Sequence, residues 1–179
     1  MEELRKQLAG RLHIADIKTL AFKAEDERNV EIFQTLFGFI FDEDKRIAEN
    51  AAWVLTHCKQ KGMRRLCQYR DAVIEKVLNT ESSTMQRLLL SLLLKQPFEK
   101  ERIRTDFLDF CLSTITSSRH SVAVRALCCY LSYKQCCHFP ELMNELESTL
   151  HLLESEQLTS GLRHSKKKVL AYIAKHKKQ

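Results

Sequence analysis

Residues 47–55 decide the fold, and they read Ile47-Ala48-Glu49-Asn50-Ala51-Ala52-Trp53-Val54-Leu55. Ile47, Ala51, Val54 and Leu55, together with Cys58 beyond the stretch, follow one another at the spacing of one face of an α-helix. Either Asp42 or Asp44 can cap this helix, because an aspartate side chain accepts hydrogen bonds from the first free backbone N–H groups. The stretch therefore predicts a helix from residue 45 with one buried face.

The same helical spacing of apolar residues recurs along almost the whole chain of 179 residues. The sequence contains only 4 Gly and 2 Pro, too few turn residues for a sandwich or barrel of many short strands. With 44% hydrophobic and 29% charged residues, its composition is that of a globular protein. Four positions punctuate the helices: Ser82 or Ser83 and Ser121 as N-caps, Gly62 after a Lys-rich helix end, and Pro140 in a first helical turn.

The helices repeat. Helices that open after a polar cap begin near residues 45, 84, 121 and 160, with one further helix between each two, so the unit is a helix pair of about 38 residues. Residues 46–52 also resemble residues 121–127 in pattern. Such a period is typical of HEAT and armadillo arrays, in which pairs stack because one pair cannot bury its own apolar face. We therefore predict an all-α, right-handed α-solenoid of about four helix pairs; the alternative is a globular helical bundle.

As a domain, residues 1–179 are predicted to form one helical-repeat unit, with a cap over 1–24 and a basic C-terminal helix over 157–179. The segment Ile47–Leu55, with its Ala-Ala-Trp core, resembles the second helix of short HEAT-like proteins of Bacteroidetes-type bacteria. Those proteins often carry an adenylosuccinate lyase label. The lyase superfamily has a mobile loop reading Ser-Ser-x-Met-Pro-x-Lys-x-Asn. Here Ser82-Ser83-Thr84-Met85 matches its first four positions, but Gln86, Arg87 and Leu88 follow. We therefore expect no lyase activity.

The formal charge of +6 is concentrated at one end of the chain. Seven lysines and arginines follow Glu156, the last acidic residue, which leaves 22 basic and 23 acidic residues in positions 1–156. This distribution argues against a nucleic-acid cradle along the whole molecule. The charged N-terminus does not resemble a signal peptide, and the longest apolar run, residues 88–94, is too short to span a membrane. We expect a cytoplasmic protein with no membrane partner.

The seven cysteines are expected to be reduced, and mostly buried in helices. Cys128, Cys129, Cys136, Cys137 and His138 suggest a zinc site, but residues seven apart on one helix are separated by about 10.5 Å. Tetrahedral ligands lie within about 4 Å of one another, so Cys129 and Cys136 could share a metal only if the helix broke between them. No catalytic dyad has an orienting third residue, and no glycine-rich phosphate loop is present. The sequence thus predicts no enzyme, no metal and no cofactor.

A candidate binding groove lies on the second helix of each pair, which lines the concave surface in HEAT arrangements. Asn50, Trp53 and His57 share a face of their helix that differs from its apolar face. By the repeat alignment, Arg87 and Arg125 project nearby, and aromatic and Arg side chains are enriched at binding hot spots. Two alternatives stay open: Trp53 fills a gap between repeats, and Arg125 pairs with a neighbouring carboxylate.

The C-terminal helix supplies a second candidate surface, on which five cations fall within an arc of about 140°: Arg163, Lys167, Lys168, Lys175 and Lys178. Leu162, Val169, Leu170 and Ile173 lie on the other side, so the helix can dock and still present its cations outward. One interpretation is a solvated helix end that complements its own dipole. The other is a contact with phosphates or with an acidic partner.

Two functions from different classes follow from these patterns. The first is a non-enzymatic scaffold or adaptor that binds a protein or peptide in the concave groove. The alternative is a nucleic-acid-associated protein, either a binder that uses the basic helix or a degenerate relative of the HEAT-like glycosylases that excise alkylated bases. Those glycosylases use a Trp and an Asp one helical turn apart. In this chain His57 stands four residues after Trp53, and that face carries no Asp.

Overall fold

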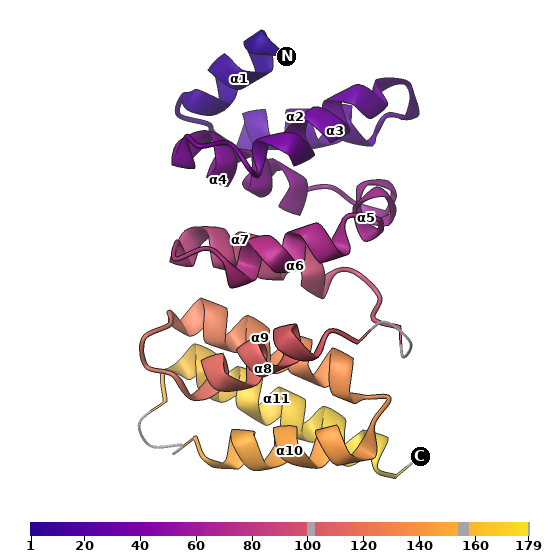
Figure 1. Ribbon diagram of the computed structural model, residues 1–179, viewed down its shortest axis with the longest axis vertical. Coiled ribbons are helices and arrows are strands. Elements are labelled where there is room, and N and C mark those ends of the chain that lie inside the picture. The colour runs from indigo at the N-terminus through magenta and orange to yellow at the C-terminus, as the bar shows by residue number, and fades with distance from the viewer. Residues whose placement is uncertain (100–102, 154–157, 179) are drawn as a thin grey trace. The chain divides into compact units, whose positions relative to one another are not determined.

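The computed structural model describes residues 1–99, 103–153 and 158–178 (Figure 1). Within these ranges the chain forms helices and no β-strand. The chain divides into two compact units, Met1–Gln96 and Pro97–Gln179. The prediction of an all-α fold built from paired helices is confirmed. No helix in the described ranges combines the length and apolarity needed to cross a bilayer.

The first unit consists of two helix pairs and the helices that flank them. Its elements are α1 (Glu2–Ala9), α2 (Ile14–Glu25), the 3-10 turn η1 (Glu27–Asn29), α3 (Val30–Phe39), α4 (Lys45–Thr56), α5 (Gln60–Cys67), α6 (Arg70–Leu78) and α7 (Ser83–Leu94). The pairs are α3 with α4 and α6 with α7, and they stack because α4 packs against α7. Residues 1–24, the predicted cap, hold α1 and most of α2, which pack against the first pair.

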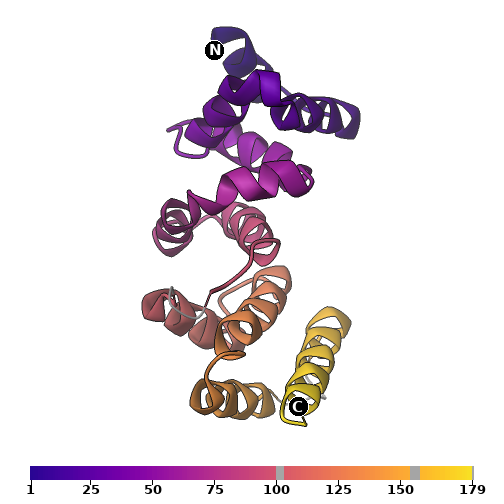
Figure 2. The same cartoon turned by 90° about the vertical axis from the view of Figure 1, so that its right-hand side faces the viewer.

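The second unit consists of two further pairs, whose colours run from rose through orange to yellow in Figure 2. Its helices are α8 (Thr105–Thr116), α9 (Val122–Cys136), α10 (Pro140–His151) and α11 (Ser160–His176). The second helix of the first pair, α9, packs against α8, α10 and α11. The predicted start of the basic helix at residue 157 lies outside the described residues, and the described helix begins at Ser160.

The second helices of the four pairs begin at residues 45, 83, 122 and 160, within one residue of the predicted positions. Three predicted caps are present. The Asp44 carboxylate accepts hydrogen bonds from the backbone N–H groups of Arg46 and Ile47, and Ser82 and Ser121 accept one each from Met85 and Val124. Pro140 occupies the first turn of α10. These local signals therefore fix where α4, α7 and α9 start, whereas Thr159 before α11 makes no side-chain cap.

The prediction for Gly62 is wrong, because this residue lies inside α5 and does not follow a helix end. One helix was expected between α4 and α7, and the structure has two, α5 and α6. The N-terminus of α5 receives no cap from its own residues. Instead, Oε1 of Glu25, from the end of α2, accepts hydrogen bonds from the backbone N–H groups of Lys59 and Gly62 at 2.6 and 3.2 Å. The cap of α5 is thus a tertiary contact.

Candidate functional site

The predicted groove residues on α4 are used partly within the protein. Asn50 donates its side-chain amide to the carbonyl oxygens of Leu8 at 2.7 Å and Gly10 at 3.3 Å, so it ties the C-terminal end of α1 to α4. The Nδ1 atom of His57 donates to the Trp53 carbonyl at 3.1 Å, and the His57 ring meets the Trp53 ring edge-on at 6.2 Å. Trp53 itself is half-buried. The side chains of Asn50 and His57 are therefore engaged within the protein.

Arg87 and Arg125 occupy different units: Arg87 lies in the first unit with Asn50, Trp53 and His57, and Arg125 lies in the second. Arg87 is exposed on α7, the helix that packs beside α4. Arg125 is half-buried on α9, and its Nε atom donates to the carbonyl oxygen of Ile115 near the end of α8 at 2.9 Å. This hydrogen bond ties the Arg125 guanidinium to the C-terminal end of the preceding helix. The sequence analysis offered a neighbouring carboxylate as the alternative partner, and the Nε atom donates to a backbone carbonyl instead.

The repeat alignment from the sequence is wrong by two residues. Helix α4 begins at Lys45 and α9 at Val122, and with these starts matched the buried positions coincide: Ile47 with Val124, Ala51 with Cys128, Ala52 with Cys129, and Val54 with Leu131. Arg125 therefore stands at the place of Ala48, and Tyr130 at the place of Trp53. The sequence analysis missed Tyr130 for this reason, because a register error moves every side chain to another face.

The second unit carries a cluster of tyrosines and lysines that we call the tyrosine–lysine face: Tyr130, Tyr133, Lys168, Tyr172 and Lys175. The Nζ atom of Lys168 lies 5.9 Å from the ring centroids of both Tyr130 and Tyr172. The rings of Tyr133 and Tyr172 lie 5.4 Å apart. Three of the four tyrosines in the chain thus gather where α9 and α11 pack together. The ammonium group of Lys168 therefore lies close to two of the three rings.

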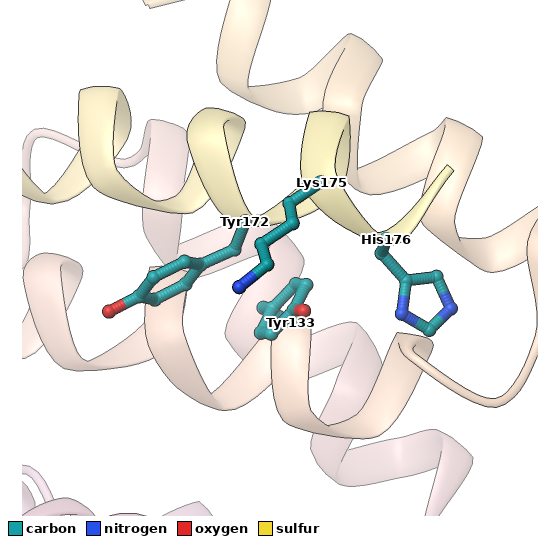
Figure 3. A pocket seen from close by; sticks show the side chains of 4 residues that line it. All are labelled: Tyr133, Tyr172, Lys175 and His176. Atoms are coloured by element: carbon teal, nitrogen blue, oxygen red, sulfur yellow. The ribbon is translucent and has the colours of Figure 1, made fainter. Parts of the chain in front are cut away.

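A pocket of about 330 Å³ opens in this face and is lined by Tyr133, Tyr172, Lys175 and His176 (Figure 3). Lys175 extends from α11 toward the two tyrosines, and the His176 imidazole projects from the end of the same helix. Burial raises the pKa of Tyr133, with Cys137 and Tyr172 adding to the effect. The Tyr133 hydroxyl therefore stays protonated at neutral pH and can donate a hydrogen bond. The pocket combines apolar ring surface with a cation and a hydroxyl donor.

Charge in the second unit is segregated by helix. The second helices α9 and α11 contain seven lysines and arginines and no acidic residue. The first helices α8 and α10 contain five acidic residues and no lysine or arginine. The helices that carry and adjoin Lys168 and Lys175, α11 and α9, therefore offer them no acidic partner. Among the described residues, no carboxylate lies within salt-bridge distance of either lysine. The tyrosine–lysine face is therefore complementary to an anionic ligand.

The predicted basic patch of α11 divides between internal contacts and solvent. Arg163 donates to the carbonyl oxygen of Leu158 at 2.9 Å, which helps to close the first turn of the helix. Lys167 and Lys178 are exposed. Lys168 and Lys175 belong to the tyrosine–lysine face. Lys168 lies near the rings of Tyr130 and Tyr172, and Lys175 lines the pocket with Tyr133 and Tyr172. The sequence of α11 alone could not show these neighbours, because Tyr130 and Tyr133 come from α9.

The thiols lie mostly in the core. Burial raises the pKa of Cys58, Cys129 and Cys136 to about 12, and that of Cys111 well above its usual value. Helix α9 is continuous from Val122 to Cys136, so the break that a shared metal would require is not present there. In the described part of the chain, no three His, Cys, Asp or Glu side chains are arranged to hold a metal ion.

These thiol pKa values predict the pattern of alkylation. Iodoacetamide at about pH 8 should modify Cys67 and Cys137 in the folded protein, because both are half-buried and Cys137 lines a second pocket of about 260 Å³. The other five cysteines are buried and should react only after denaturation, because the reagent cannot reach them in the folded protein. For Cys58, Cys111, Cys129 and Cys136 the raised pKa also lowers the amount of the attacking thiolate. Peptide mapping by mass spectrometry measures this. Modification of Cys58 or Cys129 as fast as Cys67 would contradict the buried placement.

Comparison with known proteins agrees with the arrangement of helix pairs. A family model described as a HEAT repeat domain matches residues 4–173. The match covers both units and all four helix pairs. A search of curated proteins gave no match. The chain therefore belongs to the HEAT repeat family.

Proposed function

We propose that the protein is a non-enzymatic scaffold that binds an acidic segment of a protein partner on the tyrosine–lysine face. HEAT repeats form helical-repeat scaffolds, and their stacked second helices present a continuous surface. The observation that carries the proposal is the charge of α9 and α11, which have seven basic residues and no acidic one. Complementary charge gives specificity and a fast association rate, while tyrosines in a pocket supply buried contact area.

The nearby tyrosines strengthen the binding of an anionic ligand by the two lysines. A cation above an aromatic ring is attracted to its face, so Lys168 is held in place at little further entropic cost when a ligand arrives. Tyr172 is 37% exposed and can lose that exposed surface to a ligand. A ligand carboxylate at Lys168 or Lys175 would thus lie beside apolar ring surface, where water is partly excluded and the ion pair is stronger than in open solvent.

A second candidate function is the binding of single-stranded nucleic acid. Proteins of this kind combine lysines and arginines with aromatic rings on which bases stack, and the tyrosine–lysine face contains both groups. A simpler form of nucleic-acid binding is the binding of duplex DNA by the cations of α11 alone. Four or five phosphate contacts would then give a log–log dependence of affinity on salt with a slope of about −4.

The test compares three fluorescent probes by anisotropy: a short peptide rich in Asp and Glu, a single-stranded oligonucleotide, and a duplex. We expect the peptide to bind, and the Lys168→Glu/Lys175→Glu variant to weaken it by more than about tenfold, because attraction becomes repulsion. The matched control is Lys6→Glu/Lys18→Glu, which changes the net charge equally at exposed sites in the first unit. An equal loss in the control would refute the site. Binding of an oligonucleotide without the peptide would favour the second candidate.

A further inference from the structure

The two lysines of the tyrosine–lysine face are one heptad apart on α11. Lys168 and Lys175 are separated by seven residues, and Tyr172 stands between them, four residues after the first and three before the second. At 1.5 Å per residue the lysines are about 10.5 Å apart along the helix axis, and all three side chains point to the same side. A ligand that contacts both cations must therefore present two anionic groups at about this spacing, with apolar surface between them.

Tyr172, between the lysines on α11, offers ring surface to an apolar group, and a pocket continues from it toward Lys175 and His176. The pocket of about 330 Å³ lies beside Tyr172, and Tyr133 from α9 also lines it. Its lining includes Lys175 and His176 but no acidic side chain. Of the other groups on α9 and α11 that are near in sequence to this face, Lys134, His164 and Lys167 are also basic. Nothing on these two helices therefore competes with a ligand carboxylate for the lysines.

We infer that the acidic segment binds as an α-helix, with two Asp or Glu residues seven apart and an apolar side chain between them. This inference rests on the proposed function and narrows the class of partner. In a helix, residues seven apart share a face and match the rise between Lys168 and Lys175, and residues three or four from the first acid enter the pocket. In an extended strand, residues three apart span about 10 Å but point to opposite faces. Strand residues that share a face lie about 7 or 13 Å apart, so a helix matches the spacing of the two lysines more closely than a strand does.

A polyproline II segment is the competing geometry, because its residues three apart share a face and span about 9.3 Å. The experiment accordingly uses three peptides of the same net charge. The first is an alanine-rich helix with glutamates at i and i+7 and a leucine at i+4. The second is the same helix with the second glutamate at i+5, which lies about 140° away around the axis. The third is proline-rich, with glutamates three apart. Each is titrated against the full chain by anisotropy.

We expect the i, i+7 peptide to bind at least about tenfold tighter than the other two. Lys168→Ala should lower its affinity, and should have no further effect on a peptide that lacks the glutamate facing Lys168, as in a double-mutant cycle. Tighter binding of the proline-rich peptide, or equal binding of both helical peptides, would overturn the helix inference. If all three bind equally and Lys168→Glu/Lys175→Glu abolishes binding, the proposed function survives and the helix inference fails. If no acidic peptide binds, the proposed function itself fails.

Discussion

Replacing Trp53 by alanine is expected to lower the free energy of unfolding by about 2–3 kcal/mol, and to leave binding at the tyrosine–lysine face unchanged. A fully buried Trp costs about 3–5 kcal/mol as alanine, and the loss is smaller here because Trp53 is half-buried. Its ring packs edge-on against His57, at the end of α4 where Lys95 also donates to the Thr56 carbonyl. Urea denaturation measures the change, and it is followed by far-ultraviolet circular dichroism. Trp53 is the only tryptophan, so the variant has no tryptophan fluorescence to follow.

The matched control is Phe22→Ala in the same unit. The Phe22 side chain is 77% exposed on α2, so its truncation should change stability by no more than about 0.5 kcal/mol. Together the two variants separate packing from simple loss of an aromatic ring. If Trp53→Ala proved as harmless as Phe22→Ala, the packing role would be wrong, and Trp53 would be better explained as an anchor for a partner on the first unit.

The starts of α4, α7 and α9 could be predicted from the sequence because each of them depends on local chemistry. Asp44, Ser82 and Ser121 accept hydrogen bonds from backbone N–H groups two or three residues away, and the apolar spacing that follows belongs to the same helix. Such signals lie within a few residues of the feature they determine. The period of about 38 residues follows from them without any knowledge of the tertiary structure.

Helix α5 could not be predicted in the same way. It has eight residues, of which only Gly62, Met63 and Leu66 are buried, too few to show a helical period. Its N-terminal N–H groups are capped by Glu25, which lies 34 residues before Lys59 in the sequence. Arg65 then donates to the Ala24 carbonyl at 2.8 Å, a second contact with the end of α2. A helix that depends on contacts of this kind gives no start signal in its own sequence.

The sequence analysis predicted the lysines of the candidate site but not its tyrosines. The cations of α11 are visible as a run in the sequence, and Lys168 and Lys175 were among them. The tyrosines of α9 became meaningful only with the register that the burial of Val124, Cys128 and Cys129 sets. The spacing of Tyr130 and Tyr133, three residues apart, was a usable signal for a shared face. Their approach to Lys168 and Tyr172 depends on the packing of α9 against α11, which no local pattern encodes.

Replacing Gly62 by alanine is expected to destabilise the protein by about 1–3 kcal/mol, although alanine is the better helix former. A Cβ atom at this position would lie 2.5 Å from Cβ of Cys58 and 3.6 Å from Cγ of Glu25. The Cys58 side chain is buried, and its Cβ atom is bonded directly to the backbone, so the segment that follows α4 and the start of α5 must separate. Overpacking of this kind costs about 1–3 kcal/mol, and the shift also threatens the hydrogen bond from Gly62 N–H to Glu25.

The chain offers a control of opposite sign in Gly38→Ala. Gly38 also lies within a helix, α3, but a Cβ atom there would meet nothing within 4 Å. Alanine at this position should therefore stabilise the protein by up to about 1 kcal/mol, through helix propensity and the lower entropy of the unfolded chain. Urea denaturation of both variants measures the difference between them. If Gly62→Ala were stabilising to the same extent as Gly38→Ala, α5 would not pack closely on Cys58, and the cap that Glu25 provides would have to be looser than the 2.6 Å hydrogen bond to Lys59 indicates.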